Sequence, residues 1–391
     1  MRILLFTGKG GVGKTTTAAA TALAAADAGH RTMVVSTDPA HSLADAFDID
    51  LGPLAIEIAP GLHGEQLDAQ ERMEESWGEI QGYLREVFRW AGVGNIEAEE
   101  LAVIPGLDEV FALSDIKRHA ESGDYDVLVV DCAPTAETIR FLSLPDVLGW
   151  YMERLFPVGR RVSRIVSPLV GGVTDLPVAG DETFAALGRF YDRLDGVKDL
   201  LSDAELTSVR LVVNPERMVI AEARRTATYL SLFGYRVDAV VANRLLPDSV
   251  SDPWFEEWKR LHAEHLQTIE EGFAPLPVLR AELAPHELVG VDRLRQFASA
   301  LYGDQDPSLR LSDGDALSYV RTSAGTTLCL DLPFADREDL ELGRRNDELL
   351  VRIGPYRRAI LLPDSLHRRG ITDATLQKGR LTVVFSEETS P

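Results

Sequence analysis

An octapeptide close to the N-terminus has the residue types and spacing of a phosphate-binding loop. Residues 8–15 read Gly-Lys-Gly-Gly-Val-Gly-Lys-Thr and fit the pattern G-x-x-x-x-G-K-[ST]. We expect Lys14 to bridge the β- and γ-phosphates of a nucleotide and the Thr15 hydroxyl to bind Mg²⁺. Glycines let successive backbone N–H groups of such a loop point at phosphate oxygens. The predicted nucleotide-binding residues are Gly8, Lys9, Gly10, Gly11, Val12, Gly13, Lys14, Thr15 and Thr16.

The segments on either side of this loop fit the strand and the helix that the motif requires. Residues 2–7 form a short apolar run typical of a buried strand, and residues 15–27 are rich in alanine without Gly or Pro. The beginning of the helix would add its positive dipole end to the phosphate site. A glycine-rich turn without a ligand would explain the glycines, but it would not explain the whole strand–loop–helix context.

Lys9 is a second signal within the loop. An ordinary P-loop needs no lysine directly after its first glycine. Lys9 marks the deviant class of P-loop, in which this lysine reaches the nucleotide of a partner subunit. The alternative is a solvated surface lysine. In the first interpretation, Lys9 acts on the nucleotide of a second subunit.

Two aspartates follow predicted strands and could act on the same phosphates. Residues 31–36 predict a strand before Asp38, which could orient or deprotonate the attacking water. Asp38 could equally cap a helix that begins near residue 41, and the residues alone leave both interpretations open. Residues 125–131 predict a buried parallel strand that ends in Asp131, a candidate Mg²⁺ ligand acting through water. An ordinary strand-to-helix turn would also explain that position.

Composition restricts the class of protein. The 391 residues carry a net charge of −22, which disfavours a nucleic-acid backbone as the main partner. The two cysteines, Cys132 and Cys329, form no C-x-x-C motif, so neither a disulfide framework nor a Cys₄ zinc site is available within one chain. The sequence shows neither a signal-peptide pattern nor an apolar segment of membrane-spanning length, so we expect a cytoplasmic protein.

Strand and helix patterns alternate up to residue 302 and predict a large α/β domain. The fold class is a doubly wound, mostly parallel sheet of the P-loop NTPase type with an apolar helical subdomain, followed by a small C-terminal β-sandwich. We assign residues 1–302 to the ATPase-type domain, 303–324 to a polar linker and 325–391 to the sandwich. The later α/β signals are strands at 209–213, 237–242 and 276–279 and helices at 219–233 and 291–302.

Residues 139–171 form an unusual apolar stretch interrupted by prolines. Arg160, Arg161 and Arg164 make it too charged to span a bilayer. One interpretation is a pair of core helices; the other is a mobile helical platform that presents a groove to hydrophobic segments. The pattern alone favours the core, because apolar stripes at helical spacing are usually buried.

Residues 1–302 resemble the family of arsenite-pump and guided-entry (tail-anchored protein targeting) ATPases. Residues 8–15 resemble the family's deviant P-loop. Residues 38–42, Asp-Pro-Ala-His-Ser, resemble its switch I, in which the aspartate positions the hydrolytic water, and residues 131–140 resemble its switch II. Residues 104–109, Ile-Pro-Gly-Leu-Asp-Glu, also have a counterpart in the family.

The resemblance implies an ATP- and Mg²⁺-dependent homodimer closed around two nucleotides. Asp38, Lys14 and Lys9 would be its catalytic residues, with Lys9 acting across the interface. Asn243 stands where the family recognises adenine, and Glu216 stands where it contacts the nucleotide.

The resemblance also changes the interpretation of the apolar segments. Residues 68–120 and 139–206 become a helical subdomain that binds hydrophobic or transmembrane client segments, with a transient membrane receptor as a further partner. The zinc-binding C-x-x-C of the eukaryotic targeting factors is absent, so dimerisation would depend on packing and nucleotide. Two cysteines cannot assemble the metalloid site of the arsenite-activated members, which disfavours arsenite transport.

Residues 325–386 resemble an α-crystallin (small heat-shock protein) domain. The resemblance rests on Leu330–Leu340, on Arg358–Pro363 and on Leu376–Val383. The leading hypothesis is an ATP-hydrolysing, homodimeric chaperone or targeting factor for hydrophobic or tail-anchored membrane proteins. The alternatives are a holdase or scaffold switched by nucleotide, and a soluble ATPase subunit of an anion (arsenite) pump.

Overall fold

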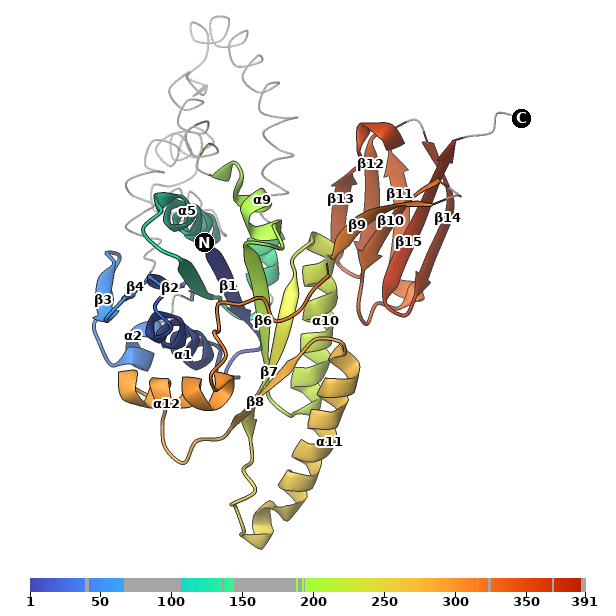
Figure 1. Ribbon diagram of the computed structural model, residues 1–391. Helices are drawn as coiled ribbons and strands as arrows, with labels where there is room; N and C mark the ends of the chain where they lie inside the picture. The colour runs from blue at the N-terminus through green and yellow to red at the C-terminus, as the bar shows by residue number, and fades with distance from the viewer. Residues whose placement is uncertain are drawn as a thin grey trace, which may run out of the picture.

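The computed structural model describes residues 1–38, 42–66, 107–135, 137–143, 188, 192, 194–314, 316–322, 325–367 and 369–387. Within these residues, an eight-stranded sheet with its helices is followed by two small antiparallel sheets (Figure 1). This arrangement confirms the predicted α/β fold with a C-terminal β-sandwich. Most of the expected client-binding subdomain, including residues 67–106 and 144–187, lies outside the described residues, as does the apolar stretch from residue 144 to residue 171.

The central sheet has the strand order β3-β4-β2-β5-β1-β6-β7-β8. Its strands pair in parallel except for β3, which runs antiparallel to β4. Every residue of β2, β5 and β6 is buried, as expected for parallel strands with helices on both faces. The strands are β1 (Arg2–Thr7), β2 (Thr32–Ser36), β3 (Ile56–Ala59), β4 (Leu62–Gln66), β5 (Val127–Asp131), β6 (Thr207–Val213), β7 (Val237–Leu245) and β8 (Val278–Glu282).

Helices cover both faces of this sheet (Figure 1). The helices are α1 (Lys14–Asp27), α2 (Ser42–Phe47), α5 (Leu107–Ser122), α9 (Val197–Ser202), α10 (Arg217–Phe233), α11 (Glu256–Phe273) and α12 (Val291–Tyr302), with a short η1 (Pro253–Phe255). α12 packs on α1, where the hydroxyls of Tyr302 and Thr21 lie 2.8 Å apart. None of the described helices is long and apolar enough to cross a membrane.

The C-terminal residues form two sheets, with strand orders β14-β15-β10-β9 and β11-β12-β13. Leu328, Leu349, Val351 and Phe385 belong to the apolar core between them. The elements are β9 (Leu317–Thr322), β10 (Gly325–Asp331), η2 (Arg337–Asp339), β11 (Leu340–Arg345), β12 (Glu348–Ile353), β13 (Tyr356–Leu361), η3 (Asp364–Leu366), β14 (Arg369–Gln377) and β15 (Arg380–Glu387).

The structure contains elements that the sequence patterns do not reveal. β9 lies within the segment assigned to the linker and pairs along its length with β10. β14 escapes a pattern search because its register shifts between Ile371 and Asp373, which breaks the alternation of a strand. α11 is an amphipathic helix of which only Ile269 and Phe273 are buried, and it was not predicted from the sequence.

Residues 303–314 are fixed to the sheet through a buried arginine. Arg210 of β6 is fully buried, and its guanidinium donates to Pro307 O (2.8 Å) and to the Tyr302 hydroxyl (3.1 Å). The same guanidinium donates to Asp238 Oδ1 of β7 (3.3 Å), which is also fully buried. A buried ion pair needs such additional hydrogen bonds to offset its desolvation. Residues 303–314 are therefore held against β6 and β7 by these hydrogen bonds.

The β-sandwich contacts the ATPase-type domain mainly through α10. The rings of Tyr229 and Tyr356 lie 4.4 Å apart between centroids, and Arg358 Nη1 donates to Leu232 O (2.7 Å). Thr228 donates its hydroxyl hydrogen to Pro333 O.

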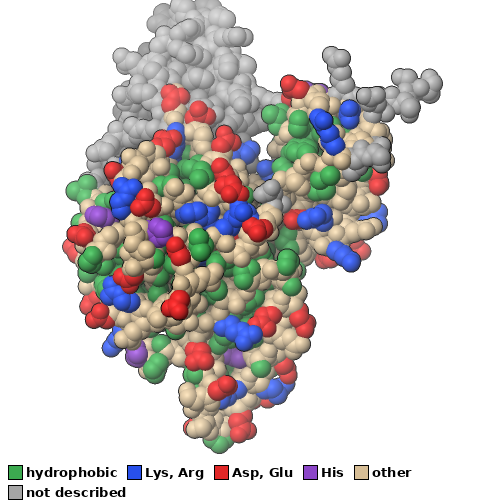
Figure 2. Space-filling model, in the orientation of Figure 1, with side chains coloured by type: hydrophobic (Ala, Val, Ile, Leu, Met, Phe, Trp, Pro, Cys, Tyr) green, Lys and Arg blue, Asp and Glu red, His purple; other side chains and the backbone are tan. Residues whose placement is uncertain are grey.

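Acidic and basic side chains are interspersed over the described face shown in Figure 2, so the described part of this face offers no continuous basic surface to a polyanion.

Candidate nucleotide-hydrolysis site

The glycine loop joins β1 to α1 and touches the ends of two other strands. Gly13 precedes α1 with φ 95°, and a Cβ there would lie 2.4 Å from Asn243 Nδ2. A Cβ on Gly8 would lie 2.3 Å from Val212 O. Both glycines are therefore needed for the glycine loop to lie close to β6 and β7. A Cβ on Gly10 would meet no atom within 4 Å, so the open side of the loop has room for a ligand.

Lys14 and Thr15 lie at the beginning of α1, as the motif predicts. The Lys14 side chain is largely buried, and its Nζ donates to Lys9 O (3.4 Å) across the loop. The Thr15 hydroxyl lies 3.3 Å from Ser42 Oγ at the start of α2. These contacts hold an ammonium and a hydroxyl beside the loop's backbone N–H groups, which suits a phosphate with its cation.

Asp131 ends β5 and is fully buried between Phe6 of β1 and Ser36 of β2. Ser36 Oγ donates to Asp131 Oδ2 (3.3 Å), whereas Oδ1 has no hydrogen-bond partner among the described residues. Burial raises the pKa of Asp131 to about 7, and the Thr15 hydroxyl and the Lys14 ammonium partly offset this effect.

The donor set at Asp131 fits Mg²⁺. A buried carboxylate oxygen without a partner is unfavourable unless a cation or a donor approaches it. Thr15 supplies a hydroxyl oxygen nearby, and two protein oxygens suit a Mg²⁺ ion that keeps waters and phosphate oxygens as its other ligands. The predicted metal residues Thr15 and Asp131 are thus brought together.

Asp38 follows β2, and its backbone is fixed on both sides. Its N–H donates to Ser36 Oγ (3.2 Å), and its carbonyl accepts from Gln66 Nε2 (3.0 Å) at the end of β4. Ser36 therefore connects Asp38 with Asp131. Sequence reasoning missed Ser36 and Gln66; their only signal is that each ends a strand at the carboxyl edge of the sheet. Residues 39–41 of the switch I motif lie outside the described residues.

Asn243 binds the glycine loop directly. Its Nδ2 donates to Val12 O (2.8 Å) in a buried hydrogen bond, and its Oδ1 accepts from Arg244 N (2.9 Å). The adenine-recognising role expected from the sequence is not tested by these contacts. They leave the second hydrogen of Nδ2 as an additional donor. Glu216 is exposed at the N-cap of α10, where its side chain makes no capping hydrogen bond.

Lys9 contacts a carboxylate of its own chain. Its Nζ lies 3.7 Å from Glu222 Oε2 of α10, and Glu222 Oε1 accepts a 2.5 Å hydrogen bond from Thr135 Oγ1 in the loop after β5. Sequence reasoning missed Glu222, because no local pattern distinguishes one glutamate on an amphipathic helix. It also missed Asn214, directly after β6, whose buried Oδ1 has no partner among the described residues.

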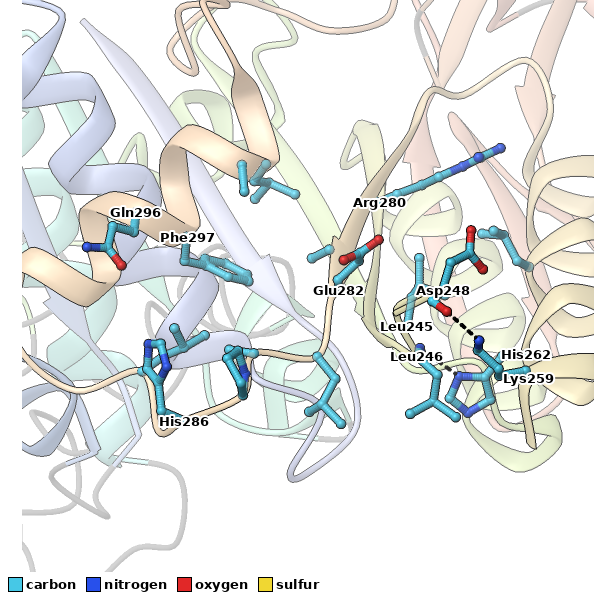
Figure 3. Close-up of a pocket in the computed structure, with 18 of the residues that line it drawn as sticks. Leu245, Leu246, Asp248, Lys259, His262, Arg280, Glu282, His286, Gln296 and Phe297 are labelled. Atoms are coloured by element: carbon cyan, nitrogen blue, oxygen red, sulfur yellow. Dashed lines mark hydrogen bonds between the residues drawn. The ribbon is translucent and has the colours of Figure 1, made fainter. Parts of the chain in front are cut away.

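A cavity of about 600 Å³ lies beyond the end of β7, two residues after Asn243 (Figure 3). Leu246 N donates to His262 Nδ1 (3.2 Å), and Lys259 Nζ donates to Asp248 O (2.8 Å). Figure 3 shows Asp248, Lys259 and His262 on one side and His286, Gln296 and Phe297 on the other.

The glycine loop, the buried aspartate of the neighbouring strand and Asp38 share the carboxyl edge of one mostly parallel sheet, which defines a P-loop nucleotide hydrolase. Residues 1–303 match the family described as "Anion-transporting ATPase", and residues 323–385 match the "HSP20-like domain found in ArsA". The chain belongs to the family described as "Anion-transporting ATPase" and is an ATPase.

The relatives that match this chain carry two kinds of name. The chain is 40% identical over 391 residues to the "Putative arsenical pump-driving ATPase" of Prosthecochloris vibrioformis, covering 99% of this chain and 96% of that protein. A protein of Aquifex aeolicus with the name "Putative arsenical pump-driving ATPase 1" is 36% identical over 396 residues, covering 99% and 100%. "ATPase GET3B" of Arabidopsis thaliana is 32% identical over 324 residues, covering 75% and 77%. The resemblance inferred from the sequence is confirmed.

Proposed function

We propose that this chain is an ATP-hydrolysing homodimeric chaperone or targeting factor for hydrophobic or tail-anchored membrane proteins. The hydrolytic part of the proposal is carried by one observation: the Ser36 hydroxyl joins the backbone of Asp38 to the buried carboxylate of Asp131. A water-orienting aspartate and a metal-binding aspartate are thereby held in one network.

The residues of the proposed site would have separate roles in phosphoryl transfer. Thr15 and Asp131 would hold Mg²⁺, which neutralises charge on the phosphates when bound. Lys14 would stabilise the charge that develops on the transferred phosphoryl oxygens. Asp38 would orient the attacking water and accept its proton, and its backbone contacts to Ser36 and Gln66 keep it in place.

Base recognition and dimerisation complete the proposed site. The cavity beyond β7 begins at Leu245, two residues after Asn243, and would receive the adenine base. The remaining donor of Asn243 would contact this base, and Glu216 would contact the same nucleotide. Lys9 would reach the nucleotide of the second subunit. Dimer closure driven by ATP would then be the motion that changes the client-binding surface.

A soluble ATPase subunit of an anion pump is the second candidate, because two relatives are named as arsenical pump-driving ATPases. The cysteines argue against an arsenite-activated version. Cys132 is buried beside Asp131, where burial raises the pKa of its thiol, and Cys329 lies on β10 of the sandwich. Soft metalloids require several converging thiolates.

The substitution Asp38→Asn tests the hydrolytic assignment. We expect kcat to fall about 100-fold or more, because the asparagine cannot accept the proton, while ATP binding persists. Asp50→Asn, at an exposed aspartate beyond α2, is the matched control and should leave kcat unchanged. Normal hydrolysis by the Asp38→Asn variant would remove the water-positioning role.

The client class is tested by adding either a transmembrane peptide or arsenite to the full-length chain. We expect a photo-reactive transmembrane peptide to cross-link within residues 139–171 in a nucleotide-dependent manner, and we expect arsenite to leave the ATPase rate unchanged. Arsenite stimulation without peptide cross-linking would favour the pump subunit instead.

A further inference from the structure

Glu222 joins three segments around the nucleotide site. It lies in the second turn of α10, its Oε2 lies 3.7 Å from Lys9 Nζ of the glycine loop, and its Oε1 accepts from Thr135 Oγ1 of the loop after β5. Each oxygen of the carboxylate therefore has a different partner. Since Thr135 is largely buried, its short hydrogen bond fixes the orientation of the carboxylate toward Lys9.

The ion pair with Glu222 engages the Lys9 ammonium, the group that the proposed dimer needs for contact with the partner's nucleotide. An ammonium has three donors, but the contact with Glu222 holds Lys9 Nζ toward α10 of its own chain, so it competes with a phosphate in a partner subunit. Lys9 and Glu222 keep 36% and 27% of their side-chain surface exposed, so the pair is open to solvent and can separate without burying a charge.

We propose that Glu222 is the resting partner of Lys9 and that its carboxylate limits how readily ATP closes the dimer. This inference rests on the proposed ATP-dependent homodimer. On closure, Lys9 exchanges the single charge of Glu222 for the multiply charged phosphates of the partner's nucleotide. Glu222 is a positioning residue: it touches no nucleotide in this arrangement and acts through Lys9 and Thr135.

The size of the effect follows from the exposure of the pair. Ion pairs of this kind contribute a factor of about 2 to 5 to an equilibrium constant. A symmetric dimer breaks two such pairs, so removing the carboxylate should raise the dimerisation constant about 4- to 25-fold.

The test is a double-mutant cycle on the full-length chain. Glu222→Gln keeps an oxygen for Thr135 but removes the charge that holds Lys9. Dimerisation is measured by analytical ultracentrifugation with Mg²⁺ and a non-hydrolysable ATP analogue. We expect Glu222→Gln to strengthen the dimer by the factor above, and we expect no such gain in a Lys9→Met background. Glu121→Gln, which breaks the pair of Lys117 and Glu121 on α5 at 3.8 Å, is the matched control.

A second measurement does not depend on dimerisation. Competitive labelling with an amine-specific reagent in the nucleotide-free chain should modify Lys9 faster in Glu222→Gln than in the unsubstituted chain. The rate at Lys117 should be the same in both. An unchanged rate at Lys9 would overturn the resting pair.

The outcomes separate this inference from the proposed function. If the unsubstituted chain dimerises with the ATP analogue but Glu222→Gln dimerises equally or less well, the role of Glu222 is overturned and the dimer stands. An equal gain in the Lys9→Met background would also overturn it. If labelling shows the pair but the unsubstituted chain stays monomeric with nucleotide, the ATP-dependent dimer fails, and the gating role of Glu222 fails with it.

Discussion

The hydrogen bond from Asn243 to Val12 O should hold the glycine loop in shape before any nucleotide arrives. It is 2.8 Å long and buried, and Val12 is almost fully buried. Asn243→Ala would leave this carbonyl without a partner, at a cost of about 1–3 kcal/mol. Because the bond closes a local contact between β7 and the loop, the cost should appear as local opening of the loop and the first turn of α1.

Hydrogen exchange of the nucleotide-free chain measures this opening. For Asn243→Ala, we expect the amides of residues 12–18 to exchange about 5- to 150-fold faster, which is the same free energy expressed as an equilibrium factor. Gly13→Ala should act in the same direction, since its Cβ would lie 2.4 Å from Asn243 Nδ2. Gly10→Ala is the control, because its Cβ meets no atom within 4 Å. Unchanged exchange in Asn243→Ala would refute the structural role of this amide.

Three further predictions concern the rest of the chain. Arg210→Met should lower the free energy of unfolding by about 3–5 kcal/mol because it leaves Asp238 buried without this partner. The double variant Arg210→Met/Asp238→Leu should recover most of this loss. Equal urea denaturation curves for Arg210→Met and the unsubstituted chain would contradict the prediction. Arg358→Met should loosen the sandwich on α10 and speed limited proteolysis near residues 303–316, whereas Arg352→Met, at an exposed pair with Glu341, should not. A thiol reagent at mildly alkaline pH should modify Cys329 before Cys132, because burial shields Cys132 and raises its pKa; the reverse order, read by mass spectrometry, would contradict its buried position.

Sequence patterns predicted those parts of the site and the fold that depend on residues close together in the chain. Lys14 and Thr15 are adjacent to the glycines that define them, and Asp131 directly follows its apolar strand. The bounds of α12 were predicted as observed, because Gly290 and Gly303 flank it with positive φ values of 86° and 56°.

The missing parts of the site depend on contacts between distant segments. Ser36 reaches Asp131 over a separation of 95 residues, and Thr135 reaches Glu222 over 87. Serine and glutamate at these places carry no motif, so only the folded sheet shows what they contact. The expected contact of Lys9 with a partner subunit stays a prediction, and the structure adds its contact with Glu222.

The central claim, that Lys9 of one subunit completes the site of the other, is tested most directly by mixing two inactive variants. Lys9→Met and Asp38→Asn should each have little ATPase activity alone. A mixed dimer would contain one complete site, in the subunit that keeps Asp38 and receives Lys9 from its partner. After subunit exchange, an equal mixture should regain about a quarter of the unsubstituted activity, since half of randomly paired dimers are mixed and each has one working site of two. A mixture as inactive as its components would show that Lys9 acts only within its own chain and would contradict the account.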